Sequence, residues 1–258
     1  MGMRFVLAAF LLVWFVPLPR GHFWTLCWIS FIAATLQYGL TFSGLALMAA
    51  TPAVLLVQSE VIFGVIIAAI LLGERPSLRQ ILGIAMASCG VVVILGAPAL
   101  EGQWLGIGLV LSGALVWAFG QVLIRRLDGA LGGFQLTAWI GVMAGPQMLL
   151  ASCLIDGNPL PAIQAAPIEA WLTVIYLGVV MTAIGYSAWY YVLARYPVPM
   201  VMPVLLLLPV AAIFGAVTML GEVPDPMVLA GGMVVIFGVG VVVVEPAYLL
   251  AWWRKKIG

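Results

Sequence analysis

The chain is a succession of long apolar stretches separated by short turns that carry most of its charged residues. A helix needs about 20 predominantly apolar residues to cross a bilayer, with about 17–25 typical. The pattern therefore predicts an all-α integral membrane protein. Nine transmembrane helices are expected, at residues 4–18, 23–47, 50–72, 79–97, 103–124, 132–154, 170–194, 199–220 and 227–249.

A motif of the form G-E-x-P-x6-G-x6-G occurs twice, with Glu74 and Glu222 at equivalent positions 148 residues apart (222 − 74). The first copy is followed by Arg75 and Arg79, whereas Asp225 stands near the second. Because basic residues are retained on the cytoplasmic side, the two turns are expected on opposite faces of the membrane. Equivalent turns on opposite faces define an inverted repeat, from which many secondary transporters are built.

The glycines of the two motifs are Gly83 and Gly90 in the first copy, and Gly231 and Gly238 in the second. Within each copy they are seven residues apart, which places both on one face of a helix. Small residues on one face let transmembrane helices approach closely, so helix packing is their expected role. Glu74 and Glu222 stand at helix ends, where capping or interfacial roles are expected.

The duplication divides the chain into a first repeat at residues 1–98 and a second at residues 103–250. Five expected helices fall in the second repeat and four in the first, whose opening helix matches the second helix of the later repeat. An inverted repeat needs an odd number of helices in each half, so a 5+5 arrangement is expected. We therefore favour a start site placed too late, or a truncated chain, over a natural nine-helix protein.

Charge is distributed unevenly between the two sides of the membrane when the expected helices alternate in direction. One side carries only Arg4 among basic residues, and nine of the ten basic residues lie on the other. This positive-inside asymmetry predicts a cytoplasmic C-terminus. The nine are Arg20, Arg75, Arg79, Arg125, Arg126, Arg195, Arg254, Lys255 and Lys256.

Composition narrows the functional classes further. Apolar residues make up 65% of the chain, charged residues 7%, and the mean hydropathy is +1.24. The net charge of +1 gives no reason to expect a nucleic-acid partner. The three cysteines lie far apart, which argues against a disulfide framework or a metal site. No cofactor is implied; the expected partners are the lipid bilayer and a small-molecule substrate.

Several segments resemble the drug/metabolite transporter superfamily, specifically its EamA-type permeases. They are RFVLAAFLL at 4–12, QSEVIFGVIIAAILLGERP at 58–76, LVWAFGQVLIRR at 115–126, IGYSAWYYVLARY at 184–196 and LLPVAAIFGAVTMLGE at 207–222. The resemblance implies ten helices in two inverted five-helix repeats, and export of small metabolites or amino acids across the cytoplasmic (inner) membrane. The chain departs from the family in lacking the first helix, and at Val61, where a proline often follows the glutamate.

Glu60 is the leading candidate for chemistry. It lies fourteen residues before Glu74, which is about 21 Å along a helix and therefore near mid-bilayer. An ionisable group there costs at least about 2.5–3.5 kcal/mol and is a functional-site hypothesis by default. With no basic partner expected at that depth, the carboxyl is expected to be neutral or to face water in a cavity. The alternative is a neutral acid that hydrogen-bonds within the helix packing.

The remaining candidates are polar and aromatic side chains, several of them spaced four residues apart on expected helices, and such faces are not expected to meet lipid. Two prolines free helix carbonyls where backbone could line a cavity. Ordinary packing is the alternative for every aromatic residue. The cavity candidates are Gln37, Tyr38, Thr41, Gln58, Trp117, Gln121, Tyr186, Trp189 and Tyr190, and the helix-breaking candidates are Pro52 and Pro209.

These features favour a secondary exporter of small metabolites or amino acids, with a proton as the candidate coupling ion at Glu60. No Walker A sequence is present, so ATP is not the expected energy source. The scarcity of intramembrane Lys and Arg argues against phosphorylated substrates. A passive channel or a non-transporting membrane protein is the alternative. An enzyme is disfavoured because the single histidine, His22, lies in a loop.

Overall fold

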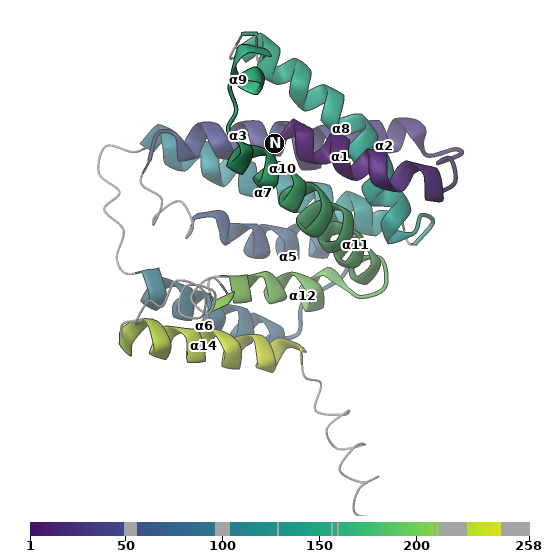
Figure 1. The fold of residues 1–258 in the computed structure, drawn as a ribbon. Helices are drawn as coiled ribbons and strands as arrows, with labels where there is room; N and C mark the ends of the chain where they lie inside the picture. The colour runs from purple at the N-terminus through teal and green to yellow at the C-terminus, as the bar shows by residue number, and fades with distance from the viewer. Residues whose placement is uncertain are drawn as a thin grey trace, which may run out of the picture. The chain divides into compact units, whose positions relative to one another are not determined.

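A computed structural model describes residues 1–48, 56–95, 104–127, 129–155, 157–158, 160–208, 210–211 and 226–243. The described residues form helices and turns, with no β-strand among them (Figure 1). Four helical stretches are long and apolar enough to cross a membrane: Phe23–Leu45, Trp104–Arg126, Gly133–Leu154 and Ile168–Leu193. Shorter apolar helices occupy Gly2–Phe15, Ser59–Leu71, Leu78–Val93, Val198–Leu207 and Leu229–Val242. Each stretch overlaps one of the expected spans, so the chain is a multi-pass membrane protein.

The chain divides into two compact units. Unit 1 comprises Met1–Phe42 and Val116–Tyr196, and unit 2 comprises Ser43–Leu115 and Pro197–Gly258. Each unit thus contains segments from both halves of the sequence. Helices that are distant along the chain therefore pack against each other within each unit.

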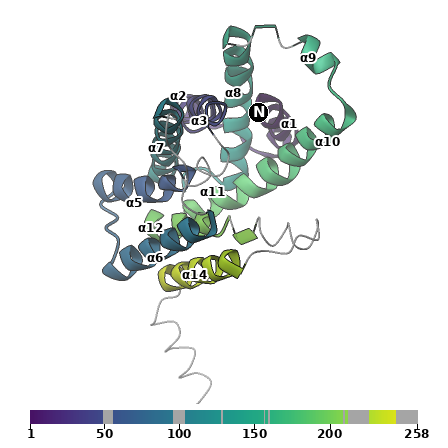
Figure 2. The ribbon, with the colours of Figure 1, turned by 90° about the vertical axis from the view of Figure 1, so that its left-hand side faces the viewer.

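Unit 1 is built around the contact between α1 and α8, which lie side by side in Figures 1 and 2. Glycines on α8 make the close approach possible, since a Cβ atom on Gly141 would meet the Phe5 carbonyl oxygen at 2.9 Å and one on Gly145 would meet Val6 Cγ2 at 2.7 Å. The elements of this unit, two of which extend into unit 2, are α1 (Gly2–Leu12), η1 (Val13–Phe15), α2 (Phe23–Ser30), η2 (Phe31–Leu36), α3 (Gln37–Leu45), α7 (Trp104–Arg126), α8 (Gly133–Ile155), α9 (Leu160–Gln164), α10 (Ile168–Tyr176), η3 (Leu177–Tyr186) and α11 (Ser187–Leu193).

Two π-helical segments interrupt the helices of unit 1. The segment η2 separates α2 from α3, and η3 separates α10 from α11. Adding 148 to the bounds of η2 gives 179–184, which falls within η3 at 177–186. π-Helical turns are rare and frequently occur at functional sites. With this shift, the two π-helical segments occupy equivalent places in the two halves of the sequence.

Unit 2 contains α5 (Ser59–Leu71), α6 (Leu78–Leu95), α12 (Val198–Val201), η4 (Met202–Leu207) and α14 (Pro226–Val243). Its principal contact joins α6 and α14, which lie side by side in Figures 1 and 2. A Cβ atom on Gly83 would meet the Gly238 carbonyl oxygen at 2.8 Å, and one on Gly90 would meet the Gly231 carbonyl oxygen at 2.8 Å. The helices are therefore antiparallel, and the repeated glycines allow their backbones to touch, which is the close-packing role that the sequence predicts for them.

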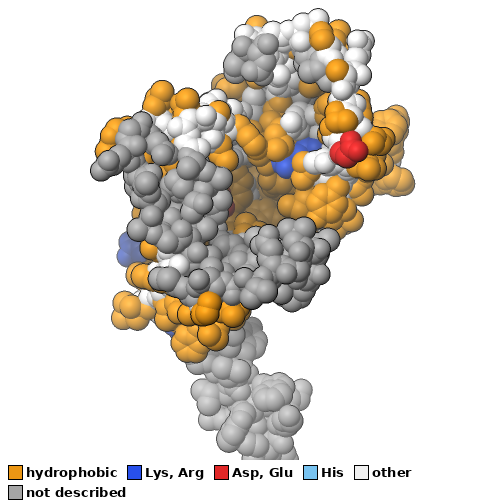
Figure 3. All heavy atoms as spheres, turned by 60° about the vertical axis from the view of Figure 1, so that its left-hand side comes forward, with side chains coloured by type: hydrophobic (Ala, Val, Ile, Leu, Met, Phe, Trp, Pro, Cys, Tyr) orange, Lys and Arg blue, Asp and Glu red, His pale blue; other side chains and the backbone are white. Residues whose placement is uncertain are grey.

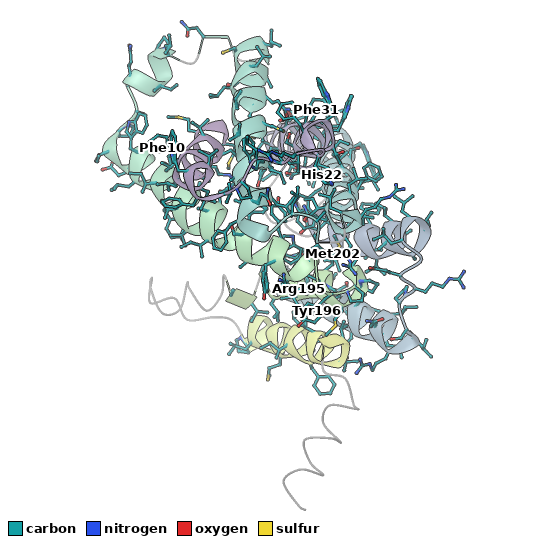
Figure 4. All side chains as sticks on the ribbon, turned by 90° about the vertical axis from the view of Figure 1, so that its right-hand side faces the viewer. Phe10, His22, Phe31, Arg195, Tyr196 and Met202 are labelled. Atoms are coloured by element: carbon teal, nitrogen blue, oxygen red, sulfur yellow. The ribbon has the colours of Figure 1, made fainter. Side chains whose placement is uncertain are left out.

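Apolar side chains dominate the described surface, as the orange atoms in Figure 3 show. Phe10 on α1 and Phe31 on η2 are both exposed (Figure 4). Trp24 and Trp104, which lie at the starts of α2 and α7, are 75% and 73% exposed, as tryptophans at a membrane interface are. Exposure of so many large apolar groups is the arrangement expected when lipid is the solvent.

Candidate functional site: a buried arginine–tyrosine cluster

Arg4, Tyr38 and Tyr186 form a connected polar group inside unit 1. Nη2 of Arg4 donates a hydrogen bond to the Tyr38 hydroxyl oxygen. The hydroxyl oxygens of Tyr38 and Tyr186 are 3.0 Å apart and share a second hydrogen bond. The two tyrosines are 148 residues apart, which is the spacing of the repeated motif. Each half of the sequence thus supplies one hydroxyl from an equivalent position.

Aromatic rings surround this group. The Arg4 guanidinium lies 4.9 Å from the centre of the Phe5 ring and 4.6 Å from that of Tyr38. Such positions attract a cation electrostatically. The rings of Tyr186 and Tyr190 are 5.6 Å apart, and Tyr190 is buried. The pair spaced four residues apart at Tyr186 and Tyr190 is therefore in contact, next to the hydrogen-bonded hydroxyl groups.

Arg4 departs most from what the sequence predicts. It is expected at the outer end of the first helix, but in the structure it is 7% exposed and its Nε–H has no hydrogen-bond partner among the described residues. Arg4 lies in the first turn of α1, and its burial was not predicted because a basic residue so near a helix end resembles an interfacial anchor. The presence of two tyrosines at equivalent positions of the repeat was the signal that could have marked this place as polar.

A second polar contact lies on α7 and α11. Gln121 is completely buried, and its Oε1 accepts a hydrogen bond of 2.8 Å from Nε1 of Trp189. The ring of Trp117 lies 6.1 Å from that of Trp189. The sequence pairs Trp117 with Gln121 on one helix, whereas in the structure both contact the same indole of another helix. Nε2 of Gln121 has no partner within the described part of the chain.

Further polar contacts of unit 1 involve glutamines. Nε2 of Gln37 donates to Oγ1 of Thr41 at 3.2 Å, as their spacing predicts, and both residues are buried. Gln147, which the sequence analysis missed, accepts a hydrogen bond of 2.9 Å from Thr35. It directly follows Pro146, which stands inside α8 and cannot donate a backbone hydrogen bond. An amide beside a proline in an apolar run is the signal that could have identified it.

Glu60 and Gln58 belong to unit 2. Glu60 is 8% exposed and lies in the first turn of α5, so it is near the beginning of this helix rather than in the middle of an uninterrupted span at 50–72. No basic side chain of the described residues forms an ion pair with it. Gln58 stands at the turn before α5, and its Oε1 is buried with no partner among the residues that the structure describes. Pro52 and Pro209 lie outside the described residues.

Glu74 connects the repeated motif to another helix. Its Oε2 accepts a hydrogen bond of 2.7 Å from the backbone N–H of Val198, the first residue of α12. A carboxylate at this position satisfies one of the free N–H groups at the helix N-terminus and interacts favourably with its dipole. Glu74 therefore caps α12 from a distant point in the sequence. Among the described residues, no group of three or more His, Cys, Asp or Glu side chains is placed to hold a metal ion.

Comparison with known proteins adds a family to this description. The profile of the EamA-like transporter family matches residues 1–96 and 104–244. A probable amino-acid metabolite efflux pump of Salmonella typhimurium is 30% identical over 92% of this chain and 82% of its own length. The corresponding pump of Escherichia coli is 28% identical over 99% of this chain and 87% of its own length.

Two further comparisons agree with these matches. A probable terminal-alkyne amino-acid exporter of Streptantibioticus cattleyicolor is 33% identical over 72% of this chain and 61% of its own length. A crystal structure with 20% sequence identity superposes with a TM-score of 0.77 over 93% of this chain and 85% of the other. At that identity the likeness concerns the fold alone.

Proposed function

Because this chain belongs to the EamA-like transporter family, we propose that it is a secondary exporter of small metabolites, with amino acids as the principal substrate class. The observation that carries this proposal is the similarity, over 92% and 99% of the chain, to two proteins named as probable amino-acid metabolite efflux pumps. Membership of the family makes the chain a membrane transporter and not an enzyme. The proposed location is the cytoplasmic (inner) membrane, with the C-terminus in the cytoplasm because basic residues gather on that side.

The proposed framework is a 5+5 inverted repeat, with its halves at residues 1–98 and 103–250. Contacts within unit 2 support it. A shift of 148 residues turns Gly83 into Gly231 and Gly90 into Gly238, and the close contacts are Gly83 with Gly238 and Gly90 with Gly231. The shift therefore exchanges the two contacts, as a two-fold axis does in a symmetric interface. Equivalent helices of an inverted repeat cross in opposite directions, and α6 and α14 are antiparallel.

Irregular helices at equivalent positions further support a transport mechanism. The π-helical segments η2 and η3 are related by the repeat, and so are the turn at Gln58 and position 206 (58 + 148) in the 3-10 segment η4. Secondary transporters place substrate and ion sites where helices are interrupted near the midplane. Gln37, Tyr38, Gln121 and Tyr186 are therefore proposed to line the substrate path in unit 1.

Proton coupling through Glu60 is the finer part of the proposal. Its burial, its place in the first turn of α5 and the lack of an ion-pair partner among the described residues support a carboxyl that is neutral when enclosed and releases its proton when the path opens to water. Exchange of that proton for a substrate ammonium group would couple the two fluxes at one site.

Replacement of Glu60 tests the coupling directly. Glu60→Gln retains size and hydrogen-bonding capacity but cannot titrate, so we expect normal insertion, retained substrate exchange and loss of the pH dependence of net transport. Glu169→Gln is the matched control, because Glu169 is an exposed carboxylate at the start of α10. An unchanged pH profile in Glu60→Gln would show that this carboxyl is structural.

Export by living cells tests the substrate class. Cells that express the chain are loaded with dipeptides, which are hydrolysed inside, and the amino acids released to the medium are measured against cells with an empty vector. We expect faster release of some amino acids and less growth inhibition by the dipeptides. If every amino acid were released at the same rate by the expressing cells and the empty-vector cells, the result would contradict the proposal. The remaining alternatives are a passive channel and a non-transporting protein. Measurements of substrate exchange distinguish both of them from a carrier.

A further inference from the structure

The Arg4 guanidinium is a buried cation for which unit 1 offers no anion among its described residues. Within the part of unit 1 that the structure describes, the acidic residue is Glu169. It is exposed at the start of α10 and forms no ion pair with Arg4. A charge that is removed from water without a partner is unfavourable, and such residues inside membranes mark substrate or ion pathways. The packing of α1 therefore does not account for the burial of the Arg4 guanidinium.

The donors of Arg4 are only partly used. A guanidinium has five N–H groups in a planar fork, and the side-chain hydrogen bond that the described residues provide for it runs from Nη2 to Tyr38. Nε–H is buried and unpaired within that part of the chain. The edge formed by Nε and Nη2 is one of the two edges on which a guanidinium binds a carboxylate through parallel hydrogen bonds. Nε–H is therefore an unused donor on that edge.

The surroundings hold the guanidinium in a defined orientation. The rings of Phe5 and Tyr38 lie against it at 4.9 and 4.6 Å, and the hydroxyl of Tyr38 is fixed in turn by that of Tyr186. Both tyrosines come from helices that contain or follow a π-helical segment. The cluster therefore joins an oriented cation to the two irregular helices of unit 1, one from each half of the sequence.

We propose that Arg4 binds the carboxylate group of the transported substrate, with the hydroxyl groups of Tyr38 and Tyr186 beside it. This inference rests on the proposed function and narrows its substrate class to small monocarboxylates, amino acids included. A single guanidinium matches one carboxylate, whereas a phosphate dianion would retain uncompensated charge at this cluster. Binding of the anion neutralises the buried cation. The hydrogen bonds from Arg4 to Tyr38 and between Tyr38 and Tyr186 connect this change to both halves of the repeat.

Chemical protection of the wild-type protein tests the site without any variant. Phenylglyoxal modifies accessible arginines, and mass spectrometry of the digested protein measures modification at each position. The probes are alanine, leucine and phenylalanine, each compared with its amide, which has the same side chain and ammonium group but no carboxylate. Arg195 is the internal control, because it is exposed and packs on Tyr191 at 3.5 Å.

We expect at least one of the acids to slow modification of Arg4, its amide to have no such effect, and modification of Arg195 to be the same throughout. Equal protection by acid and amide, or protection by none of the probes, would overturn the proposal. An Arg4 that fails to react without any probe would overturn it too, since a residue that meets substrate must be reached by the reagent.

Variants of Arg4 separate this inference from the proposed function. In Arg4→Gln, affinity for a transported acid is expected to fall about tenfold or more, while that for its amide changes little. Arg4→Lys should recover part of the affinity, because it retains the charge but not the fork. If the wild type exports amino acids and Arg4→Gln weakens acid and amide alike, the carboxylate site is wrong and export stands. If Arg4 is protected by acids and no amino acid is transported, the export proposal fails and the site stands.

Discussion

Replacement of Gly90 by alanine probes the contact on which the proposed repeat depends. The new Cβ atom would meet the Gly231 carbonyl oxygen and the Val235 amide nitrogen, each at 2.8 Å. Both are backbone atoms of α14 and cannot rotate away. Ordinary van der Waals contact begins near 3.4 Å, so α6 and α14 must separate by about 0.6 Å (3.4 − 2.8) to accept the methyl group.

The cost follows from that separation. A gap of about 0.5–1 Å forfeits a quarter to a half of each dispersion contact along the interface, and overpacking of a well-packed core costs about 1–3 kcal/mol. Alanine recovers up to about 1 kcal/mol relative to glycine through its higher helix propensity. We therefore expect Gly90→Ala to lower the free energy of unfolding by about 1–2 kcal/mol.

Unfolding of the purified protein by SDS titration, followed by helical circular dichroism, measures this change. Gly240→Ala is the matched control, because it lies on α14 and its Cβ atom would have no neighbour within 4 Å. It should be neutral or gain up to about 1 kcal/mol. Gly83→Ala should lose stability as Gly90→Ala does, and the double variant should lose less than the sum because one displacement of α6 relieves both contacts. Equal stability of Gly90→Ala and Gly240→Ala would refute the reasoning.

Two further predictions concern hydrogen bonds that join distant parts of the chain. Tyr186→Phe should cost about 0.5–1.5 kcal/mol by removing one hydrogen bond, and Tyr38→Phe should cost more because its hydroxyl also accepts from Arg4. In the Tyr38→Phe background, adding Tyr186→Phe should cost nothing. SDS titration of the wild type, the two single variants and the double variant measures these costs, and additive costs would contradict the hydrogen bond between the two tyrosines. Glu74→Ala should cost about 0.5–2 kcal/mol through loss of the cap on α12, whereas Glu74→Gln retains an acceptor for Val198 N–H and should lose less; equal thermal stability of the two variants would contradict the capping role.

Hydrophobic patterning predicts the helical segments well because lipid demands a fixed length of apolar residues. The expected starts at residues 23 and 103 agree closely with Phe23–Leu45 and Trp104–Arg126. Repeated glycines likewise predict close helix packing, since absence of a side chain is itself the cause of close approach, but that α6 and α14 are each other's partners is known only from the structure. The π-helical segments could not be foreseen, because a change from i+4 to i+5 hydrogen bonding leaves no mark in an apolar run.

The hydrogen-bond partners in the polar site were harder to predict than the burial of its side chains. Burial of Gln37, Thr41 and Gln121 follows from the cost of placing amides and hydroxyls in hydrocarbon. Their partners depend on how the helices pack, so the bond from Trp189 to Gln121 was not evident. Arg4 stands where interfacial and buried arginines look alike in a sequence. Only its three-dimensional neighbours distinguish the two.

Counterflow in proteoliposomes tests the central claim, that the chain is a carrier of small metabolites, most directly. Vesicles that contain the purified protein are preloaded with an unlabelled amino acid identified in the export assay and diluted into a trace of the labelled form. A carrier with alternating access predicts saturable entry, in which the label accumulates transiently above its equilibrium level as the unlabelled amino acid leaves. Entry that rises linearly with concentration and never exceeds equilibrium would indicate a channel, and entry equal to that of protein-free vesicles would contradict transport altogether.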